Sequence, residues 1–296
     1  MQVHQNSTRV KAPDNDCPVV AASSDSTEHN DDASLNPSNG RDASEGRSEK
    51  TSLLKCKKSI KIATMNVRTI RLKSNQYELV NNATKHGIEI IGIVDHKICH
   101  EDELEYHQFE KHTLVTTSAW RNASNSPVGG VGILVNKSVE SALGSVQKWN
   151  ERILVAEFNG NPNTTIIVHY APCEGSPDAE EHFNNLNEVT ASIPKHNVLL
   201  VVGDFNGHIG KTHEQYTYHN TTNKNGQHVI DFAEEADMFI TNTNFRKKCG
   251  KLWTYISDMS GTKTQVDYIL IRRKWKNSVK DCKAYNTFSS IGSDEF

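Results

Sequence analysis

Long apolar runs are missing from this chain of 296 residues. No window approaches the roughly 18 consecutive apolar residues that a membrane-spanning helix needs, so we expect no membrane association. The first residues also lack a basic stretch followed by an apolar run, which argues against a secretory signal. We therefore expect an intracellular protein that is not secreted.

Closely spaced cysteines and an excess of one charge are absent as well. The six cysteines stand at positions 17, 56, 99, 173, 249 and 282, and no two have the C-x-x-C spacing of a zinc knuckle or redox motif. Scattered single cysteines in a large chain are typical of a reducing compartment. The 33 basic and 36 acidic residues give a formal charge of -3, and this balance excludes a histone-like polyelectrolyte.

Residues 1–50 lack the side chains that build a core. They contain no Phe, Trp, Tyr or Ile and one Leu, and they carry nine acidic and five basic residues. Such a segment cannot bury enough apolar surface to offset the entropy of ordering it. We predict that residues 1–58 form a disordered tail rich in Ser, Asp and Asn. Residues 59–296, about 240 in all, suffice for one domain and are marginal for two.

From residue 59 onward, strand and helix patterns alternate. Short apolar or alternating runs bounded by turn residues predict strands, and apolar residues at helical spacing predict helices, one of them ending at a C-capping Gly87. The predicted strands are 59–65, 88–94, 110–118, 129–136, 152–158, 164–170, 197–202, 266–271 and 278–285. The predicted helices are 72–86, 178–192 and 225–237. Many strands with few helices predict an α/β sandwich of two sheets.

Polar residues collect where these strands end. Carboxylates and amides at strand ends favour a hard cation such as Mg²⁺, which takes few protein carboxylates and completes its shell with water and substrate phosphate. Such an ion lowers the pKa of water and offsets charge on a phosphate. The candidate residues are Asn66, Asp95, Tyr170, Asp204, Asn206, Asp267 and Asp294.

Each candidate has a plainer interpretation. A lone Asp after a strand is more often a turn or helix-cap residue, His169 fits a core histidine, and Asp267 fits a partner for a nearby Arg. The segment 199–206, LLVVGDFN, favours a functional site, because an apolar strand, a glycine and then Asp-x-Asn place two oxygen ligands at one strand exit.

Six stretches carry a resemblance to a known family. They are 61–69 (KIATMNVRT), 119–122 (AWRN), 168–172 (VHYAP), 203–206 (GDFN), 251–255 (KLWTY) and 265–269 (QVDYI). Together they resemble the endonuclease/exonuclease/phosphatase superfamily, which includes deoxyribonuclease I and apurinic/apyrimidinic endonucleases. Within it, the chain is most similar to endonuclease domains of non-LTR (LINE-type) retrotransposons and to craniofacial-development-protein-2-like proteins. The resemblance covers about residues 59–294.

The resemblance implies a four-layered α/β sandwich, with two central mixed β-sheets flanked by helices, and Mg²⁺- or Mn²⁺-dependent nicking of DNA. It places Asn66, Asp95 and Asp294 at metal-site positions. Tyr170 matches the residue that contacts the scissile phosphate, and Asp204 and Asn206 match the pair that activates water. Asp267 matches the residue that orients a catalytic His.

Two positions depart from the family pattern. The family closes its site with Ser-Asp-His and a last core strand, whereas this chain ends GSDEF, with Glu295 at the His position. Asp95 stands where the family has Glu, so its carboxylate is one methylene shorter, and errors of about 1 Å can cost around 100-fold in rate. We therefore expect a C-terminally truncated domain that lacks its last strand.

Basic clusters near the C-terminal end predict a DNA contact, because cations beside aromatic rings suit a phosphate backbone. Solvated surface charge is an equally good interpretation of each cluster. The family would make the protein nuclear and monomeric, with a reverse transcriptase domain in the parent element. Two alternatives stay open: an inactive DNA- or protein-binding remnant, and a phosphatase. The candidate DNA-binding residues are Arg246, Lys247, Lys248, Lys251, Trp253, Arg272 and Arg273.

Overall fold

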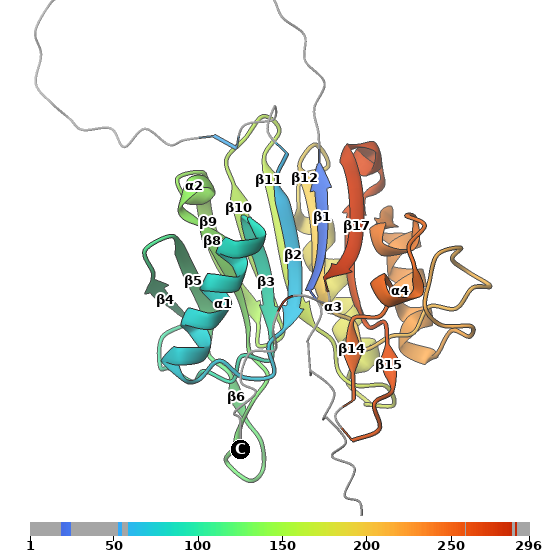
Figure 1. Ribbon diagram of the computed structural model, residues 1–296, viewed down its shortest axis with the longest axis horizontal. Helices are drawn as coiled ribbons and strands as arrows, with labels where there is room; N and C mark the ends of the chain where they lie inside the picture. The colour runs from blue at the N-terminus through green and yellow to red at the C-terminus, as the bar shows by residue number, and fades with distance from the viewer. Residues whose placement is uncertain (1–18, 25–52, 55–58, 258, 286–287, 289–296) are drawn as a thin grey trace, which may run out of the picture.

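The computed structural model describes residues 19–24, 53–54, 59–257, 259–285 and 288. Two mixed β-sheets lie face to face, and helices cover their outer faces (Figure 1). The predicted four-layered α/β sandwich is therefore confirmed. Among the described residues, no helix has the length and apolar composition needed to cross a membrane.

The first sheet has the strand order β17-β1-β2-β3-β8-β5-β4. Its one parallel pair joins β2 to β3, and the other neighbours are antiparallel. In sheet order, the strands are β17 (Val279–Tyr285), β1 (Val19–Ser24), β2 (Lys61–Asn66), β3 (Ile90–Val94), β8 (Val131–Asn136), β5 (His112–Thr117) and β4 (Leu104–Gln108).

The second sheet has the order β13-β16-β12-β11-β10-β9. Here β11 and β12 form the parallel pair. In sheet order, the strands are β13 (Met238–Ile240), β16 (Asp267–Arg272), β12 (Val198–Asp204), β11 (Thr164–Tyr170), β10 (Ile153–Phe158) and β9 (Leu143–Asn150). Two short hairpins project from the sandwich (Figure 1): β6 (Trp120–Arg121) with β7 (Pro127–Val128), and β14 (Tyr255–Ile256) with β15 (Lys263–Thr264).

Four α-helices and three 3₁₀ helices complete the fold of the described residues. The α-helices are α1 (Lys73–His86), α2 (Lys137–Glu140), α3 (Ala179–Ser192) and α4 (Lys224–Glu235). The 3₁₀ helices are η1 (Thr241–Thr243), η2 (Cys249–Lys251) and η3 (Arg273–Ser278). Helix α1 ends as predicted at Gly87, whose φ of 61° lets its N–H reach the carbonyls of Ala83 and Thr84.

Three apolar clusters hold the layers together. The first lies between the sheets and includes Val94 and Val202. The second joins α3 and α4 to the second sheet through residues such as Phe183 and Phe232, and the third packs α1 on the first sheet through Leu79. Burying one such side chain contributes roughly 1.5–3 kcal/mol, so these clusters fix the strand ends that carry the polar residues.

The structure differs from the predictions at several strands. β1 lies inside residues 1–58, for which the composition predicts disorder, and Leu54 is buried there too. β4 and β9 escape the sequence pattern because the side chains along them are half-buried or exposed, and the two strands lie at sheet edges. β1 lies between β2 and β17 in the first sheet, and the expected loss of a last core strand stays a prediction.

Candidate functional site

The candidate site is a pocket of about 580 Å³ at the carboxyl ends of the two parallel strand pairs. Asn66 is the last residue of β2, and Asp95 directly follows β3. Tyr170 and Asp204 end β11 and β12, where the register places them side by side. Asn206 follows two residues later, so the pocket contains five of the predicted site residues from both sheets.

Hydrogen bonds position the Asp204 carboxylate. Asn66 Nδ2 donates to Oδ2 of Asp204 at 3.2 Å, and the backbone N–H of Asn206 donates to Oδ1 at 2.9 Å. The Asn206 amide in turn donates to the carbonyl of Ala171 at 2.8 Å. Asp204 is therefore oriented by partners from both sheets, which suits a group that must meet a substrate in one geometry.

Asp95 lines the same pocket and is held by contacts of its own. It accepts the N–H of Gly129 at 3.1 Å, and its other oxygen lies 3.3 Å from the Lys97 ammonium. Burial, the largest cause, raises the pKa of Asp95, and Lys97 opposes that rise. The Asp95 carboxylate, although one methylene shorter than a glutamate, therefore reaches the pocket and forms an ion pair with Lys97 there.

Several pocket residues have left-handed backbone conformations. The φ angles are 55° at Arg68, 60° at Asp95, 59° at Lys97 and 47° at Asn206. For residues with a Cβ this conformation costs roughly 1–2 kcal/mol, least for Asn and Asp. Strain of this kind concentrates at functional sites, where the surrounding fold holds it, and here it collects around one pocket.

Burial disfavours the charges of the site carboxylates. Burial, with a contribution from Asp95, raises the pKa of Asp204 to about 6, against the hydrogen bonds from Asn206 and Asn66. Burial and the Asp204 charge also raise the pKa of Asp267 well above its ordinary value. A bound cation would relieve both effects.

Asp267 is behind the pocket and does not line it. It is 3% exposed and lies opposite Asp204 in the β12–β16 register. Within the part of the chain that the structure describes, its Oδ1 has no hydrogen-bond partner. Asp294, a predicted metal-site residue, and Glu295, at the position of the family's His, lie outside the described residues.

Tyr170 lines the pocket with its phenol group protonated. Burial first, and then the charges of Asp95 and Asp204, raise the pKa of Tyr170. The Arg152 guanidinium lies 4.4 Å from the Trp120 ring and donates to the Tyr170 carbonyl at 3.2 Å. Trp120, from the predicted AWRN stretch, therefore supports this wall of the pocket through Arg152.

Sequence reasoning missed several residues of this pocket. Arg68 and Lys97 are cations directly in the lining, and Glu174 and His208 face the same space. The ring of His208 stacks on that of His219 with centroids 3.8 Å apart. The signal was present in the sequence, because Arg68 and Lys97 each lie two residues after a predicted site residue, as does His208 after Asn206.

His169 is a core histidine, as the plainer interpretation of the sequence has it. It is fully buried, and its Nδ1 lies 3.1 Å from Nε2 of His182. Burial lowers the pKa of both imidazoles, so they are neutral core residues behind Tyr170.

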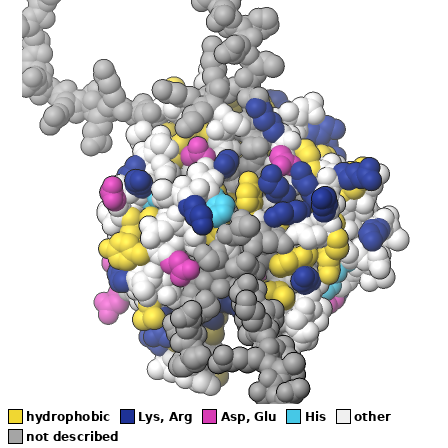
Figure 2. All heavy atoms as spheres, viewed as in Figure 1, with side chains coloured by type: hydrophobic (Ala, Val, Ile, Leu, Met, Phe, Trp, Pro, Cys, Tyr) yellow, Lys and Arg dark blue, Asp and Glu magenta, His cyan; other side chains and the backbone are white. Residues whose placement is uncertain are grey.

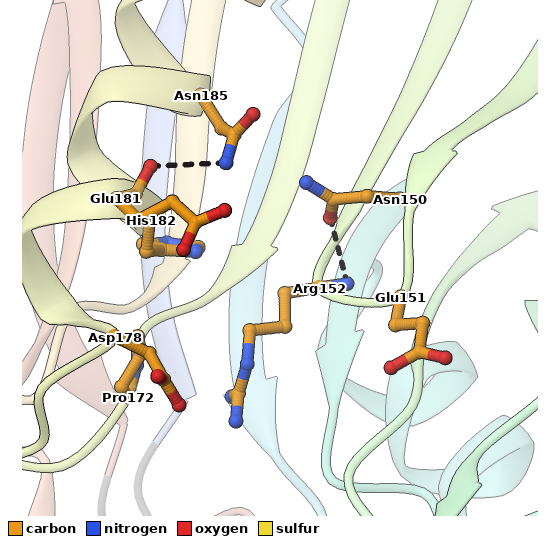
Figure 3. Close-up of a pocket in the computed structure, with 8 residues that line it drawn as sticks. All are labelled: Asn150, Glu151, Arg152, Pro172, Asp178, Glu181, His182 and Asn185. Carbon is orange, nitrogen blue, oxygen red and sulfur yellow. Dashed lines mark hydrogen bonds between the residues drawn. The ribbon is translucent and has the colours of Figure 1, made fainter.

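A second pocket, of about 330 Å³, opens beside α3 (Figure 3). The figure shows the Arg152 side chain extending into it, on the side of Asp178 and Pro172. Glu151 and Glu181 also line it, so its carboxylates outnumber its one cation. Carboxylates also outnumber cations in the first pocket, but that pocket has two cations, Arg68 and Lys97, where this one has only Arg152.

Two of the predicted DNA-binding residues make contacts within the fold. Arg272 is buried, and its guanidinium donates to the carbonyls of Ile193, Pro194 and Asn197. That guanidinium holds the loop after α3, and a DNA contact by Arg272 stays a prediction. Arg273 pairs with Asp237 at 3.0 Å, at the end of β16 away from Asp267.

The remaining predicted basic residues lie between η1 and β14, in and just before η2. Trp253 is buried under the Lys263 ammonium, so its ring is not available for stacking on a base. Lys247 and Lys283 both pair with Asp281 of β17, and Figure 2 shows Lys and Arg side chains gathered on this side of the molecule. The DNA-binding role stays a prediction for all seven candidates. Exposure favours it most for four of them, which are exposed or partly exposed: Arg246, Lys247, Lys248 and Lys251.

The oxygen donors of the pocket fit a divalent ion. Asn66, Asp95 and Asp204 provide an amide and two carboxylates, which is the few-ligand set that Mg²⁺ accepts when water and phosphate supply the rest. Burial raises the pKa of both carboxylates, and a cation bound beside them would favour their ionised forms. Among the described residues, no three His, Cys, Asp or Glu side chains form a ready-made cluster, so such an ion would depend on the amide and the substrate.

Three solved structures share this architecture at low sequence identity. An AP endonuclease from Leishmania major aligns with a TM-score of 0.60 at 12% identity, covering 78% of this chain and 85% of that one. A 3'-5' exonuclease from Neisseria meningitidis gives 0.54 at 16%, covering 74% and 90%. An endonuclease/exonuclease/phosphatase family protein from Leptotrichia buccalis gives 0.52 at 11%, covering 76% and 97%. The chain has the endonuclease/exonuclease/phosphatase fold.

Two curated proteins that are similar to this chain in sequence are more than twice as long as the region that they share with it. Craniofacial development protein 2 of Bos taurus is 28% identical over 263 residues, which are 86% of this chain and 43% of that protein. The protein of the same name from Tragulus javanicus gives 28%, 86% and 44%. The chain thus spans less than half the length of these relatives. No model of a protein family matches the chain.

Proposed function

We propose that this domain is a metal-dependent endonuclease that nicks DNA and descends from a non-LTR retrotransposon. The observation that carries the proposal is the convergence of Asn66, Asp95, Tyr170 and Asp204 on one pocket. The nuclease-like fold agrees with it. The origin rests on the retrotransposon-like stretches of the sequence, and a nuclear location and a reverse transcriptase domain in the parent element are predictions that follow from it.

The chemistry would begin at Asp204. With a pKa of about 6, its carboxylate is ionised at pH 7–8 and basic enough to take a proton from an attacking water. The water oxygen forms a bond to phosphorus, and the opposite P–O bond of the DNA backbone breaks. The Tyr170 phenol, which stays protonated, donates a hydrogen bond to a phosphate oxygen.

His208 is the group in the pocket best suited to protonate the leaving oxygen. Among the described lining residues, it carries the one imidazole. Its stacking partner His219 accepts the N–H of Gln265 at Nε2, and the pKa of His219 is lowered to about 4. His219 therefore stays neutral, and an incoming phosphodiester anion would favour a proton on His208 against the lowering effect of burial.

Asn66 and Asp95 would hold a Mg²⁺ or Mn²⁺ ion with the help of substrate oxygens. When bound, the ion offsets negative charge on the phosphate and leaving oxygen. Arg68 and Lys97 would add fixed positive charge at the same wall, and they are better placed for the DNA backbone than the buried Arg272.

A second function, DNA binding without cleavage, is favoured by one feature of the sequence. Glu295 stands where the resemblance places a catalytic His, and a carboxylate there would repel a phosphate. The phosphatase alternative finds no comparable support, because the retrotransposon-like stretches resemble DNA nucleases.

The test is nicking of supercoiled plasmid. The wild-type chain should convert supercoiled plasmid to the open-circular form with Mg²⁺ and should stop when EDTA is added. Asp204→Asn should abolish nicking and preserve plasmid binding, whereas Asp237→Asn, the same change far from the pocket, should leave the rate unchanged. Binding without nicking by the wild-type chain would favour the second function, and failure to bind DNA would remove both.

A further inference from the structure

The strand β1 lies in the interior of the first sheet, between two strands that are far from it in sequence. It lies between β2 and β17 and is antiparallel to both (Figure 1). Without it, each neighbour would carry a row of unpaired N–H and C=O groups. Residues 25–60 separate β1 from β2, whereas an antiparallel hairpin needs only two to five connecting residues. β1 therefore docks on the sheet from a distance along the chain.

The sequence of this region singles out the same segment. Within residues 1–50, the run from 17 to 22, CPVVAA, is the only place where more than two apolar residues stand together. Valine favours extended structure, and the flanks are polar and acidic. One short strand-forming run in an otherwise polar segment is what a docking strand requires.

The receiving strands offer buried residues at several positions of the register. Ala22 lies opposite Ile62 of β2 and Cys282 of β17, and Ala21 lies opposite Ala63. Ile62, Ala63 and Cys282 are all buried, and Ile62 and Cys282 belong to the cluster between the sheets. The place between β2 and β17 is therefore a groove that is lined by core residues and open to main-chain hydrogen bonding.

We propose that this groove is a strand-acceptor site and that residues 19–24 of the same chain are its tethered ligand. The ligand class is an extended peptide that pairs antiparallel to β2 through its main chain. Because the ligand belongs to the same chain, its effective concentration is in the millimolar range, so a free peptide at micromolar concentration does not displace it. Docking also steadies β2, whose last residue is Asn66 of the candidate site.

Disulfide trapping in the full chain tests the register directly. Residues opposite each other in antiparallel strands have Cα atoms about 4.5–5.5 Å apart, which suits a disulfide. Ala22→Cys should therefore form a bond to the native Cys282 under a copper–phenanthroline oxidant, identified by peptide mass spectrometry. Ala21→Cys, whose β17 partner is Lys283, should not form it. A disulfide that joins the introduced cysteine of one chain to Cys282 of another chain would overturn the assignment to the same chain.

Hydrogen exchange covers the case in which the buried Cys282 thiol, whose pKa is raised to about 12, reacts too slowly. Ala21→Pro removes a main-chain donor from β1 and should speed amide exchange in β2 and β17 at least tenfold. Ala33→Pro, outside β1, should not. A fluorescent peptide of residues 17–26 should bind the Ala21→Pro chain and not the wild type, and a scrambled peptide should bind neither. Unchanged exchange together with no peptide binding would refute the proposal, whatever the nuclease activity.

Discussion

Replacing Asp204 by Asn should abolish nicking and also make the metal-free fold more stable at pH 8. The Asp204 side chain is 5% exposed, and burial raises its pKa from 3.8 to about 6. Ionising the folded protein there costs about 3 kcal/mol more than ionising the unfolded chain. The neutral Asn side chain avoids this cost.

One lost contact reduces the gain. Asn66 Nδ2 donates to Asp204 Oδ2, and the Asn206 N–H donates to Oδ1. The amide of an Asn at position 204 has one oxygen and one NH₂ group, so it can accept only one of these bonds. The lost hydrogen bond costs about 1 kcal/mol, which leaves a net gain of about 2 kcal/mol. For a domain of this size, that raises Tm by roughly 4–8 °C.

The pH dependence gives a second signature of the same cause. Between pH 3.8 and about 6, the folded protein binds more protons at Asp204 than the unfolded chain does. The free energy of unfolding of the wild type should therefore fall as the pH rises through this window. Below it, Asp204 is protonated in both states and the gain from the substitution disappears. Asp204→Asn should flatten this part of the curve.

The assay is thermal unfolding followed by circular dichroism in EDTA from pH 3.5 to 8. Asp237→Asn is the matched control, because Asp237 is exposed and pairs with Arg273 at the surface, where a substitution changes stability by less than about 0.5 kcal/mol. A lower Tm for Asp204→Asn than for the wild type at pH 8, or an unchanged pH slope, would refute the reasoning from burial.

Four further changes test other parts of the structure. Lys97→Gln should weaken DNA binding and reduce its salt slope by about 1, whereas Lys274→Gln, outside the pocket, should not; equal slopes in a salt titration would count against the pocket as the DNA contact. His208→Gln should slow nicking by about 10²-fold or more without weakening plasmid binding, and a rate equal to the wild type would exclude a proton-donor role. Arg272→Met should cost about 2–3 kcal/mol in urea unfolding, because buried carbonyls lose their donor, while DNA affinity stays the same. Gly203→Ala should cost more than about 4 kcal/mol, since its Cβ would lie 1.9 Å from a carbonyl oxygen of β11; a soluble, native-like variant would contradict this.

The sequence alone determined the sandwich and the neighbourhood of the site. Continuous apolar runs such as those of β3 and β12 predict strands buried on both faces, and Gly87 marks the end of α1. Polar residues directly after such strands meet at one edge of the fold, because parallel strands in one sheet end on the same side. Within each sheet, chain order is therefore enough to bring Asn66 near Asp95 and Tyr170 beside Asp204. The packing of the two sheets then joins both groups in one pocket.

Tertiary structure decided which charges face the pocket and which support the fold. Arg68 and Lys97 reach the site through left-handed backbone turns, and Arg272 is turned inward to carbonyls of a distant loop. The identity of a basic residue does not show whether it lines a pocket or holds the fold together. Only its contacts in the folded chain decide between these roles. The strand β1 was likewise missed, because its six residues pair with two strands distant in the chain. The short apolar run that contains it does not by itself indicate a pairing partner.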